Sequence, residues 1–383
     1  MTILSWIALM TLAIWLLLAI EIMRGNRTVV ALRTISPNTP FDPPRVSVIV
    51  AARNEQRNIR EALRSLLALS YPNYELIVVD DRSDDDTGTI LDNLTVTNPR
   101  LKVIHIDALP PRWLGKNHAL WVGANRAGGE LLLFTDADIV MEPTTLTRAV
   151  NMMLAGQIDH LAVSPSMAMP TNFLQMFGAS FIIFFSMFIR PWKARDPHSA
   201  CHIGIGAFNF VRAEAYRSVG GHKTIHLRPD DDIKLGKILK KGGFRSEVAY
   251  GPDFLSVEWY PSLGEVIRGL EKNAFSGSDY NVALILAGSI FHLAATVWPY
   301  IALFVTSGIT QLLYAGVVLA LTLLFADCTT FHNSRRWYAI GFPLCTTLFV
   351  WIMLRTTVLN LLQGGITWRG TFYALKELKS NRI

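Results

Sequence analysis

The chain has 383 residues, of which 51% are apolar, and it carries a net charge of +6. Its mean hydropathy of +0.30 is high for a soluble protein of this length, so we expect part of the chain to lie in lipid. No basic stripe with interleaved aromatic residues is present, which argues against nucleic acid as a partner and favours acidic lipid. The three cysteines (Cys201, Cys328 and Cys345) have no CxxC spacing and indicate neither a zinc site nor a disulfide framework.

The first segment is apolar. Residues 3–20 contain no charged side chain, and at about 1.5 Å per residue they reach most of the way through a hydrocarbon layer of about 30 Å. A cleaved signal peptide is the alternative, but the segment has no basic start and no small-x-small cleavage site. We therefore predict a membrane anchor over residues 1–23, followed by a basic, proline-rich linker over residues 24–44. Because Arg24, Arg27 and Arg33 follow the anchor, the next region is expected on the cytoplasmic side of the inner membrane.

Residues 45–275 alternate between β-branched runs and amphipathic segments. We predict strands at Val46–Ala52, Tyr74–Val79, Leu101–Ile106 and Glu130–Thr135, and helices at Asp84–Leu94 and Lys116–Arg126. Between the first two strands, Ile59, Leu63, Leu66 and Leu67 recur at helical spacing and predict a further helix. Such alternation indicates an α/β fold with a mostly parallel sheet that is covered by helices on both faces. Ligands of these sheets bind beyond the carboxyl ends of the strands.

Acidic and amide side chains follow three of the predicted strands. They form the sets Asn54 and Glu55, Asp80 and Asp81, and Asp136 and Asp138. One Asp at a strand end is commonly a turn or helix cap, but three sets at one edge favour a ligand site. A divalent metal such as Mg²⁺ or Mn²⁺ takes one or two protein carboxylates together with diphosphate oxygens. Side chains alternate along a strand, so we expect Asp136 and Asp138 to point to one side and Ala137 to turn away.

Two further motifs carry charge toward this edge. Lys116 follows Gly115 at a predicted helix start, where it could neutralise a phosphate; the alternative is a solvated lysine. The run Asp230-Asp231-Asp232 begins a helix whose apolar residues Ile233, Ile238 and Leu239 are expected to face inward. Capping explains one or two of these carboxylates. The remaining one is a candidate general base, with a pKa raised by its neighbours.

Further apolar segments follow. We predict that residues 173–189 form an interfacial helix, the alternative being a buried core helix. Apolar runs at Val282–Thr306, Ile309–Ala326 and Ile340–Leu362 predict a transmembrane region over residues 276–363 with two or three spans. Three spans would place the basic tail, residues 364–383, on the far side, against the charge rule that places the middle. The segment containing Arg355 is therefore the candidate for a re-entrant helix.

Several motifs together resemble a known family. They are Val46-Ser-Val-Ile-Val-Ala-Ala-Arg-Asn-Glu, Ile77-Val-Val-Asp-Asp-Arg-Ser-Asp-Asp, Leu114-Gly-Lys-Asn-His-Ala-Leu, Thr135-Asp-Ala-Asp, Gly206-Ala-Phe-Asn-Phe-Val-Arg-Ala-Glu-Ala-Tyr and Val219-Gly-Gly-His. In this order, residues 45–275 resemble the family 2 glycosyltransferases of the inverting GT-A class. The resemblance implies a Rossmann-like GT-A domain in the cytoplasm, flanked by transmembrane helices, that uses a nucleotide sugar.

The resemblance also implies a role for each site residue. Glu55 would lie at the ribose and uracil end of the donor, Asp81 would bind the base, Lys116 would lie near the diphosphate, Asp136 would face the ribose, Asp138 would hold the metal and Asp232 would be the catalytic base, with Asp231 as its substitute.

The sequence departs from the family at one motif. Processive members carry Gln-x-x-Arg-Trp after the base, whereas this chain has Glu265-Val-Ile-Arg-Gly, which favours transfer of a single sugar. The tail Gly364-Gly-Ile-Thr-Trp-Arg-Gly is similar to that of bacterial transferases acting on carotenoid or hopanoid-type lipids. The resemblance therefore implies transfer from a UDP-sugar to a hydroxyl of a membrane lipid. The alternatives are a GT-A nucleotidyltransferase, a processive polysaccharide synthase and a non-catalytic membrane subunit.

Overall fold

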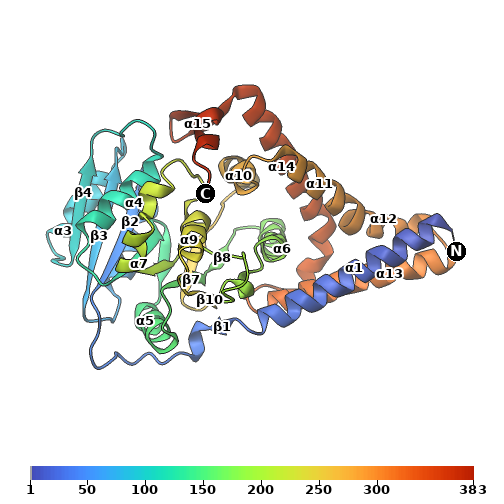
Figure 1. Ribbon diagram of the computed structural model, residues 1–383, viewed down its shortest axis with the longest axis horizontal. Coiled ribbons are helices and arrows are strands. Elements are labelled where there is room, and N and C mark those ends of the chain that lie inside the picture. The colour runs from blue at the N-terminus through green and yellow to red at the C-terminus, as the bar shows by residue number, and fades with distance from the viewer. Residues whose placement is uncertain (1) are drawn as a thin grey trace. The chain divides into compact units, whose positions relative to one another are not determined.

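The computed structural model describes residues 2–383, apart from the side chain of Lys272. The chain forms two compact units. One, here called the helical unit, contains the described residues 2–28, 168–190 and 259–380. The other, the sheet unit, contains residues 29–167, 191–258 and 381–383. Figure 1 shows both units along the chain.

The sheet unit is built on eight strands in the order β1-β10-β7-β9-β5-β2-β3-β4. Their bounds are β1 Val30–Ala31, β2 Val46–Ala52, β3 Tyr74–Asp81, β4 Leu101–Ile106, β5 Leu131–Asp136, β7 His160–Ser164, β9 Asn209–Arg212 and β10 Ser246–Tyr250. Only β9 among these runs antiparallel to its neighbours, β5 and β7. The predicted α/β class and mostly parallel sheet are therefore confirmed.

Helices cover both faces of this sheet. Their bounds are α2 Ile59–Leu67, α3 Thr87–Thr95, α4 Gly115–Arg126, α5 Thr145–Gly156, α7 Ala213–Ser218, α8 Gly221–Thr224 and α9 Asp231–Lys241. Alternation along β2 explains the two layers: Val48 and Val50 pack in one core cluster with Leu63 of α2. Ile49 packs on the other face with Leu120 of α4 and residues of α9. A strand buried on both faces requires a continuous apolar run, as its sequence shows.

Two local predictions differ from the structure. Helix α3 begins at Thr87 rather than at Asp84, because the acidic side chains bind the neighbouring loop, with Asn54 donating to Asp84 at 2.5 Å. In α9, Leu235 is buried together with Ile238, whereas Ile233 is only half-buried.

A small second sheet has the order β6-β11-β8, with β6 Ile139–Met141, β8 Ser166–Ala168 and β11 Leu255–Glu258.

The helical unit contains the apolar segments. Its helices are α1 Ile3–Asn26, α6 Asn172–Ile189, α10 Leu263–Gly277, α11 Val282–His292, α12 Trp298–Val305, α13 Gly308–Thr329, α14 Phe342–Gln363 and α15 Leu375–Ser380, and a hairpin of β12 Gly365–Trp368 and β13 Thr371–Ala374 precedes α15. A π-helical turn, Leu293–Val297, joins α11 to α12. Five helical segments of the described chain are long and apolar enough to cross a membrane: 3–26, 172–193, 282–305, 308–329 and 336–363.

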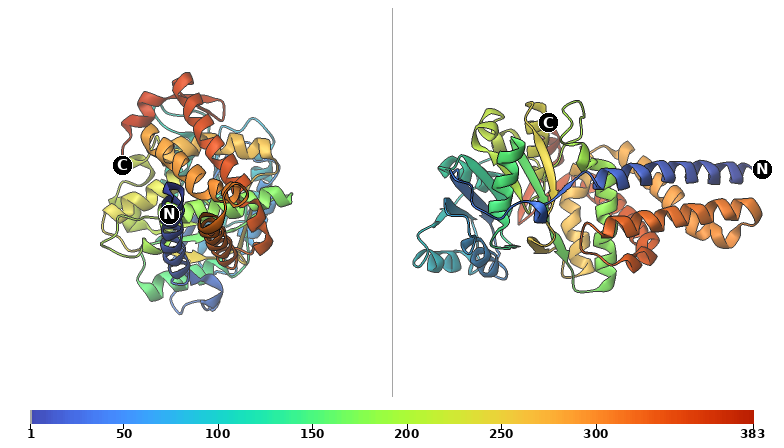
Figure 2. Two further views of the ribbon diagram at one scale, coloured as in Figure 1. Left: turned by 90° about the vertical axis from the view of Figure 1, so that its right-hand side faces the viewer. Right: turned by 90° about the horizontal axis from the view of Figure 1, so that it is seen from below.

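Helices α1 and α13 run side by side in the same direction. Ser5 and Thr310 share a hydrogen bond of 2.7 Å near their starts, and Arg27 pairs with Asp327 near their ends. Helix α6 lies across the direction of α1 (Figure 2). It packs through Phe184 against Phe342 and Phe349 of α14. Residues 173–189 therefore pack with the other long apolar helices, and not inside the α/β core.

Candidate active site

The carboxyl ends of β2, β3 and β5 lie at one edge of the sheet. Ala52 pairs in register with Asp80, and Ala51 pairs with Asp136. The acidic residues that follow these strands are therefore brought to the same edge, as predicted. Strand β5 ends at Asp136, and Ala137 and Asp138 form a turn before β6. The expected alternation along an extended strand thus does not reach Asp138, while Ala137 is buried in the core.

Asp80 and Asp81 have different surroundings although both are buried. Asp80 accepts a hydrogen bond of 2.9 Å from the ring of His105. Asp81 is held by the guanidinium of Arg82 in two hydrogen bonds, of 2.7 and 2.9 Å, and Arg53 lies 3.8 Å away. Asp80 thus pairs with a neighbouring strand, and Asp81 belongs to a charged cluster beside the loop after β2.

Asp138 lies in a field of negative charge. Burial, together with the charges of Asp136 and Glu55, raises the pKa of Asp138 to about 7. Three of the predicted site residues therefore influence one another. Glu55 is half-buried, and its backbone N–H donates to Thr87 at 2.8 Å. A divalent cation would relieve the repulsion among these carboxylates, which fits the residues present.

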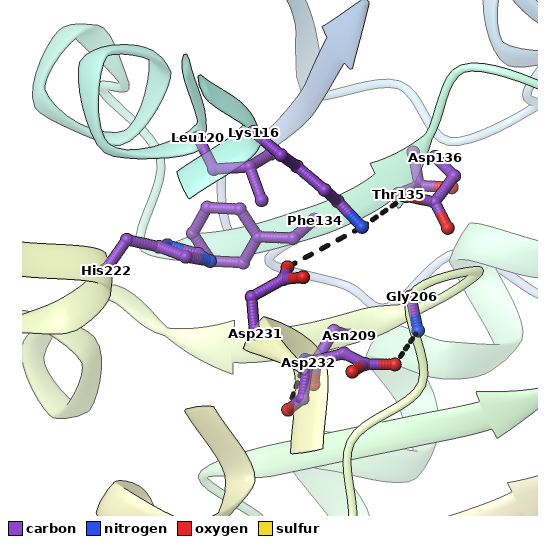
Figure 3. Close-up of a pocket in the computed structure, with 10 residues that line it drawn as sticks. All are labelled: Lys116, Leu120, Phe134, Thr135, Asp136, Gly206, Asn209, His222, Asp231 and Asp232. Atoms are coloured by element: carbon purple, nitrogen blue, oxygen red, sulfur yellow. Dashed lines mark hydrogen bonds and ion pairs between the residues drawn. The ribbon is translucent and has the colours of Figure 1, made fainter. Parts of the chain in front are cut away.

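Lys116 contacts both sets of carboxylates (Figure 3). Its Nζ lies 2.7 Å from Asp136 and 3.6 Å from Asp231. Burial disfavours the ammonium, but the charges of Asp136, Asp231 and Asp232 outweigh burial and raise the pKa of Lys116. Lys116 is therefore a fixed cation of the site and not the solvated lysine of the alternative interpretation.

The three consecutive aspartates, residues 230–232, differ in the groups that they contact. Asp230 accepts two hydrogen bonds from the buried guanidinium of Arg228, at 3.0 and 3.1 Å, and Lys234 lies 3.5 Å from it. This carboxylate therefore has a structural role. Asp231 turns toward Lys116, and Asp232 lies beyond it in the same cavity (Figure 3).

Asp232 is oriented by backbone N–H groups. Gly206 donates to its Oδ2 at 2.8 Å, and its own helix donates through Ile233 to Oδ1 at 2.8 Å. Burial and the charge of Asp231 raise the pKa of Asp232 to about 7, although Lys116 acts in the opposite sense. A carboxylate that is half-protonated near neutral pH is suited to general acid–base chemistry.

Sequence reasoning missed several residues of this cavity. Ten residues line it: Lys116, Leu120, Phe134, Thr135, Asp136, Gly206, Asn209, His222, Asp231 and Asp232. Asn209 donates to the backbone carbonyl of Asp232 at 3.2 Å. His222 is bonded to Tyr216 at 2.9 Å, and burial, with the charge of Lys116, lowers its pKa to about 3. The motifs containing Asn209 and His222 were visible in the sequence, but nothing in their spacing distinguished these side chains from core residues.

Comparison with known proteins identifies the family of residues 47–220. The family model described as glycosyl transferase family 2 matches residues 47–220. The chain carries a family 2 glycosyltransferase domain. The predicted family and the predicted enzyme class are thereby confirmed.

Relatives extend the similarity beyond the domain. The 4,4'-diaponeurosporenoate glycosyltransferase of Staphylococcus aureus strain MRSA252 is 21% identical over 345 residues, covering 88% of this chain and 90% of the relative. The enzyme of the same name from the bovine strain RF122 / ET3-1 is 22% identical over 348 residues. Among solved structures, the mannosyltransferase PcManGT of Pyrobaculum calidifontis, in complex with GDP-Man and Mn²⁺, is 19% identical. It aligns with a TM-score of 0.57, covers 94% of this chain and supports the fold.

Proposed function

We propose that this glycosyltransferase moves one sugar from a nucleotide-diphosphate sugar, a UDP-sugar in the first instance, to a hydroxyl of a membrane lipid or lipid-like acceptor, with inversion. The observation that carries the proposal is the placement of Asp232. Two backbone N–H groups hold its carboxylate in a cavity shared with Lys116 and Asp136. A candidate base therefore lies beside groups suited to a diphosphate.

The proposed reaction is one displacement. Asp232 takes the proton of the acceptor hydroxyl, whose oxygen forms a bond to the anomeric carbon. The bond from that carbon to the diphosphate oxygen breaks on the opposite face, and the electron pair leaves with the nucleoside diphosphate. Asp231 is the substitute for this role. Asp230 is not a candidate, because Arg228 and Lys234 already pair with it.

Lys116 and the strand-end carboxylates would serve the leaving group. The ammonium of Lys116 is held by Asp136 at 2.7 Å, so its charge is already in place when negative charge grows on the diphosphate. Asp138 would hold Mg²⁺ or Mn²⁺ together with donor oxygens, and the metal would supply further stabilisation of that charge. No group of three or more His, Cys, Asp or Glu side chains suited to an ion occurs in the described chain. In our proposal the donor therefore supplies the remaining ligands.

Glu55 and Asp81 would bind the nucleoside. The family resemblance assigns Glu55 to the ribose and uracil end and Asp81 to the base. Glu55 follows β2 and Asp81 ends β3, and both strands reach the edge where Asp136 lies. The side chain of Asp81 already accepts a hydrogen bond from Arg82. Asp81 would therefore act by orienting this charged cluster toward the nucleobase.

The acceptor is proposed from the relatives and the apolar helices. The relatives named above carry 4,4'-diaponeurosporenoate in their names, and the part of the chain that the structure describes has five helices long and apolar enough to cross a membrane. We propose an inner-membrane enzyme with its catalytic domain in the cytoplasm. Helix α6, lying across α1, would be interfacial (Figure 2).

We propose three membrane spans in all, of which two lie in the C-terminal region, because this number places the basic tail on the side that its charge favours. With α1, α11–α12 and α13 as the spans, the tail returns to the side of the catalytic domain, as the charge rule requires. Helix α14 would then lie at the interface or re-enter the membrane. Its Arg355 pairs with Glu271 of α10 at 3.0 Å, which would reduce the cost of a charge there.

Three alternatives are less well supported. A nucleotidyltransferase would have no use for a base at Asp232, and the family assignment favours sugar transfer. A processive synthase would be expected to carry Gln and Trp around Arg268, where this chain has Glu265 and Gly269. A non-catalytic subunit would retain its function without Asp138 and Asp232.

The test combines a donor panel with matched variants. Membranes are incubated with UDP-glucose, UDP-GlcNAc, GDP-mannose and a nucleoside triphosphate, and glycosylated lipids are identified by mass spectrometry. We expect Asp232→Asn to abolish transfer while UDP binding, measured by calorimetry, is retained. The exposed Asp42 provides the control Asp42→Asn. Full activity of Asp232→Asn would remove this residue from the mechanism, and product formed only from the triphosphate would overturn the proposed reaction.

A further inference from the structure

The loop between α8 and α9 determines where the proposed base lies. Residues 225–230 form this loop, and Asp231 begins α9 directly after it. Helix α4 holds one side of the loop. The backbone N–H of Leu114 donates to His226 at 2.9 Å. The side chain of Asn117 donates to the carbonyls of Ile225 and Arg228 at 2.8 and 2.9 Å. The segment that supplies Lys116 therefore also supports the loop before Asp231.

A residue from the far end of the sequence holds the loop again. Asn381 accepts a hydrogen bond from the backbone N–H of Leu227 at 3.1 Å. Its side-chain amide donates to the carbonyl of Thr224 at 2.9 Å. Ile383 packs against the core cluster that contains Ile225 and residues of α9. One amide side chain thus satisfies two backbone groups, one at the end of α8 and one in the loop, that lie about 150 residues earlier in the chain.

We propose that Asn381 is a positioning residue for the catalytic base, acting through the loop at residues 225–230. This inference rests on the proposed function of Asp232. The loop has no helical or strand ladder of its own, so its shape depends on the side chains that bind its backbone. Both hydrogen bonds of Asn381 reach the backbone directly, and a displacement of the loop moves the start of α9 with it. Misplacement of a reacting group by about 1 Å can cost about a hundredfold in rate.

Asn381 is the first residue after the boundary between the two units in the sequence. It follows Ser380, the last residue of α15, and α15 belongs to the helical unit. Asn381 itself belongs to the sheet unit. The peptide bond between residues 380 and 381 therefore joins the helical unit covalently to Asn381, which hydrogen-bonds to the loop at residues 225–230.

The first test measures the loop without reference to catalysis. Hydrogen–deuterium exchange of the full-length protein in detergent reports on the amide of Leu227. We expect about tenfold faster exchange in Asn381→Ala, since one hydrogen bond protecting this amide is lost. The exposed neighbour Arg382 provides the control Arg382→Ala, in which exchange should equal that of the unmodified chain. Unchanged exchange in Asn381→Ala would overturn the proposal.

The second test separates positioning from binding and from folding. In Asn381→Ala we expect kcat to fall tenfold to a hundredfold, with the KM for the UDP-sugar within about twofold, because the strand-end residues proposed to bind the donor are untouched. Asn381→Asp keeps the size and the acceptor for Leu227 but cannot donate to Thr224, so kcat should fall by an intermediate amount. Faster exchange with an unchanged kcat would overturn the proposal. So would a rise in KM that matches the fall in kcat, or a loss of thermal stability in both variants large enough to account for the lost activity.

The two proposals fail in different ways. If Asp232→Asn is active, the proposed base is wrong, whatever Asn381 does. If Asp232→Asn is inactive and both Asn381 variants have the kcat of the unmodified enzyme, the base stands and the positioning role of Asn381 is refuted.

Discussion

Gly206 offers a sharp test of how closely the two halves of the site approach. It donates its N–H to Asp232, and a Cβ built at this position would lie 2.6 Å from Oδ2 of Asp136 and 3.6 Å from Oδ2 of Asp232. Its φ lies outside the left-handed region, so alanine brings no backbone strain. The effect of Gly206→Ala should therefore be steric and local.

The size of this effect follows from the contact. Ordinary carbon contacts lie near 3.5 Å, so the carboxylate of Asp136 must move by roughly 1 Å. That shift disturbs the ion pair of 2.7 Å with Lys116. We expect a loss of about a hundredfold in kcat, equivalent to roughly 2.7 kcal/mol of barrier, with a change in thermal stability of only a few degrees.

The assay compares single-sugar transfer by Gly206→Ala with transfer by Gly277→Ala. A Cβ at Gly277 meets nothing within 4 Å, so this variant should behave as the unmodified enzyme. A Gly206→Ala enzyme with full kcat would show that the close approach of Asp136 and Gly206 has no part in catalysis. An equal loss of kcat in both variants would indicate inactivation during preparation of the protein and not an effect of the contact at Gly206.

Three further predictions concern charge and membrane contact. Because burial raises the pKa of Asp232 to about 7 and the base acts when deprotonated, kcat/KM should rise with pH up to about 7 and then level off. Lys116→Met should move this limb to higher pH, since the lysine lowers that pKa; a limb that stays in place would refute the coupling. Arg228→Met leaves Asp230 without its bidentate partner and should cost about 3–5 kcal/mol of unfolding free energy, measured by urea titration in detergent. An unchanged midpoint and slope of that titration would contradict this estimate. Phe188, exposed on α6, should be at the membrane surface, so Phe188→Glu should slow transfer to lipid more than hydrolysis of the donor, measured by released UDP; an equal effect on both would argue against an interfacial α6.

Local sequence patterns predicted the scaffold well. The bounds of β2 and β4 agree with the prediction residue by residue, and α2 covers the apolar positions that predicted it, because strand alternation and helical spacing are properties of short segments. The edge that collects Glu55, Asp81 and Asp136 could also be predicted, since parallel strands place their carboxyl ends together.

Other features depended on contacts that no local pattern records. The side chain of Arg228 decides which of three consecutive aspartates is structural, and sequence spacing left that choice open. Ala137 and Asp138 form a turn after β5, so the alternation expected of an extended strand does not reach Asp138. Residues 172–189 lie between two parts of the sheet unit in sequence but pack among the apolar helices. The hydrogen bonds of Asn381 cross more than 150 residues.

The site thus joins two kinds of support. Asp136 ends strand β5 and pairs in register with Ala51 of β2, so the sheet holds the side of the site that we propose to bind the donor. Asp232 lies in the first turn of α9, after a loop whose backbone is held by the amides of Asn117 and Asn381. Lys116, bonded to Asp136 and close to Asp231, is the cation that both sides share. In our proposal, a movement of the loop therefore changes the distance between Asp232 and the donor while the residues proposed to bind the donor stay in place, so that Asp232 is the adjustable part of this site.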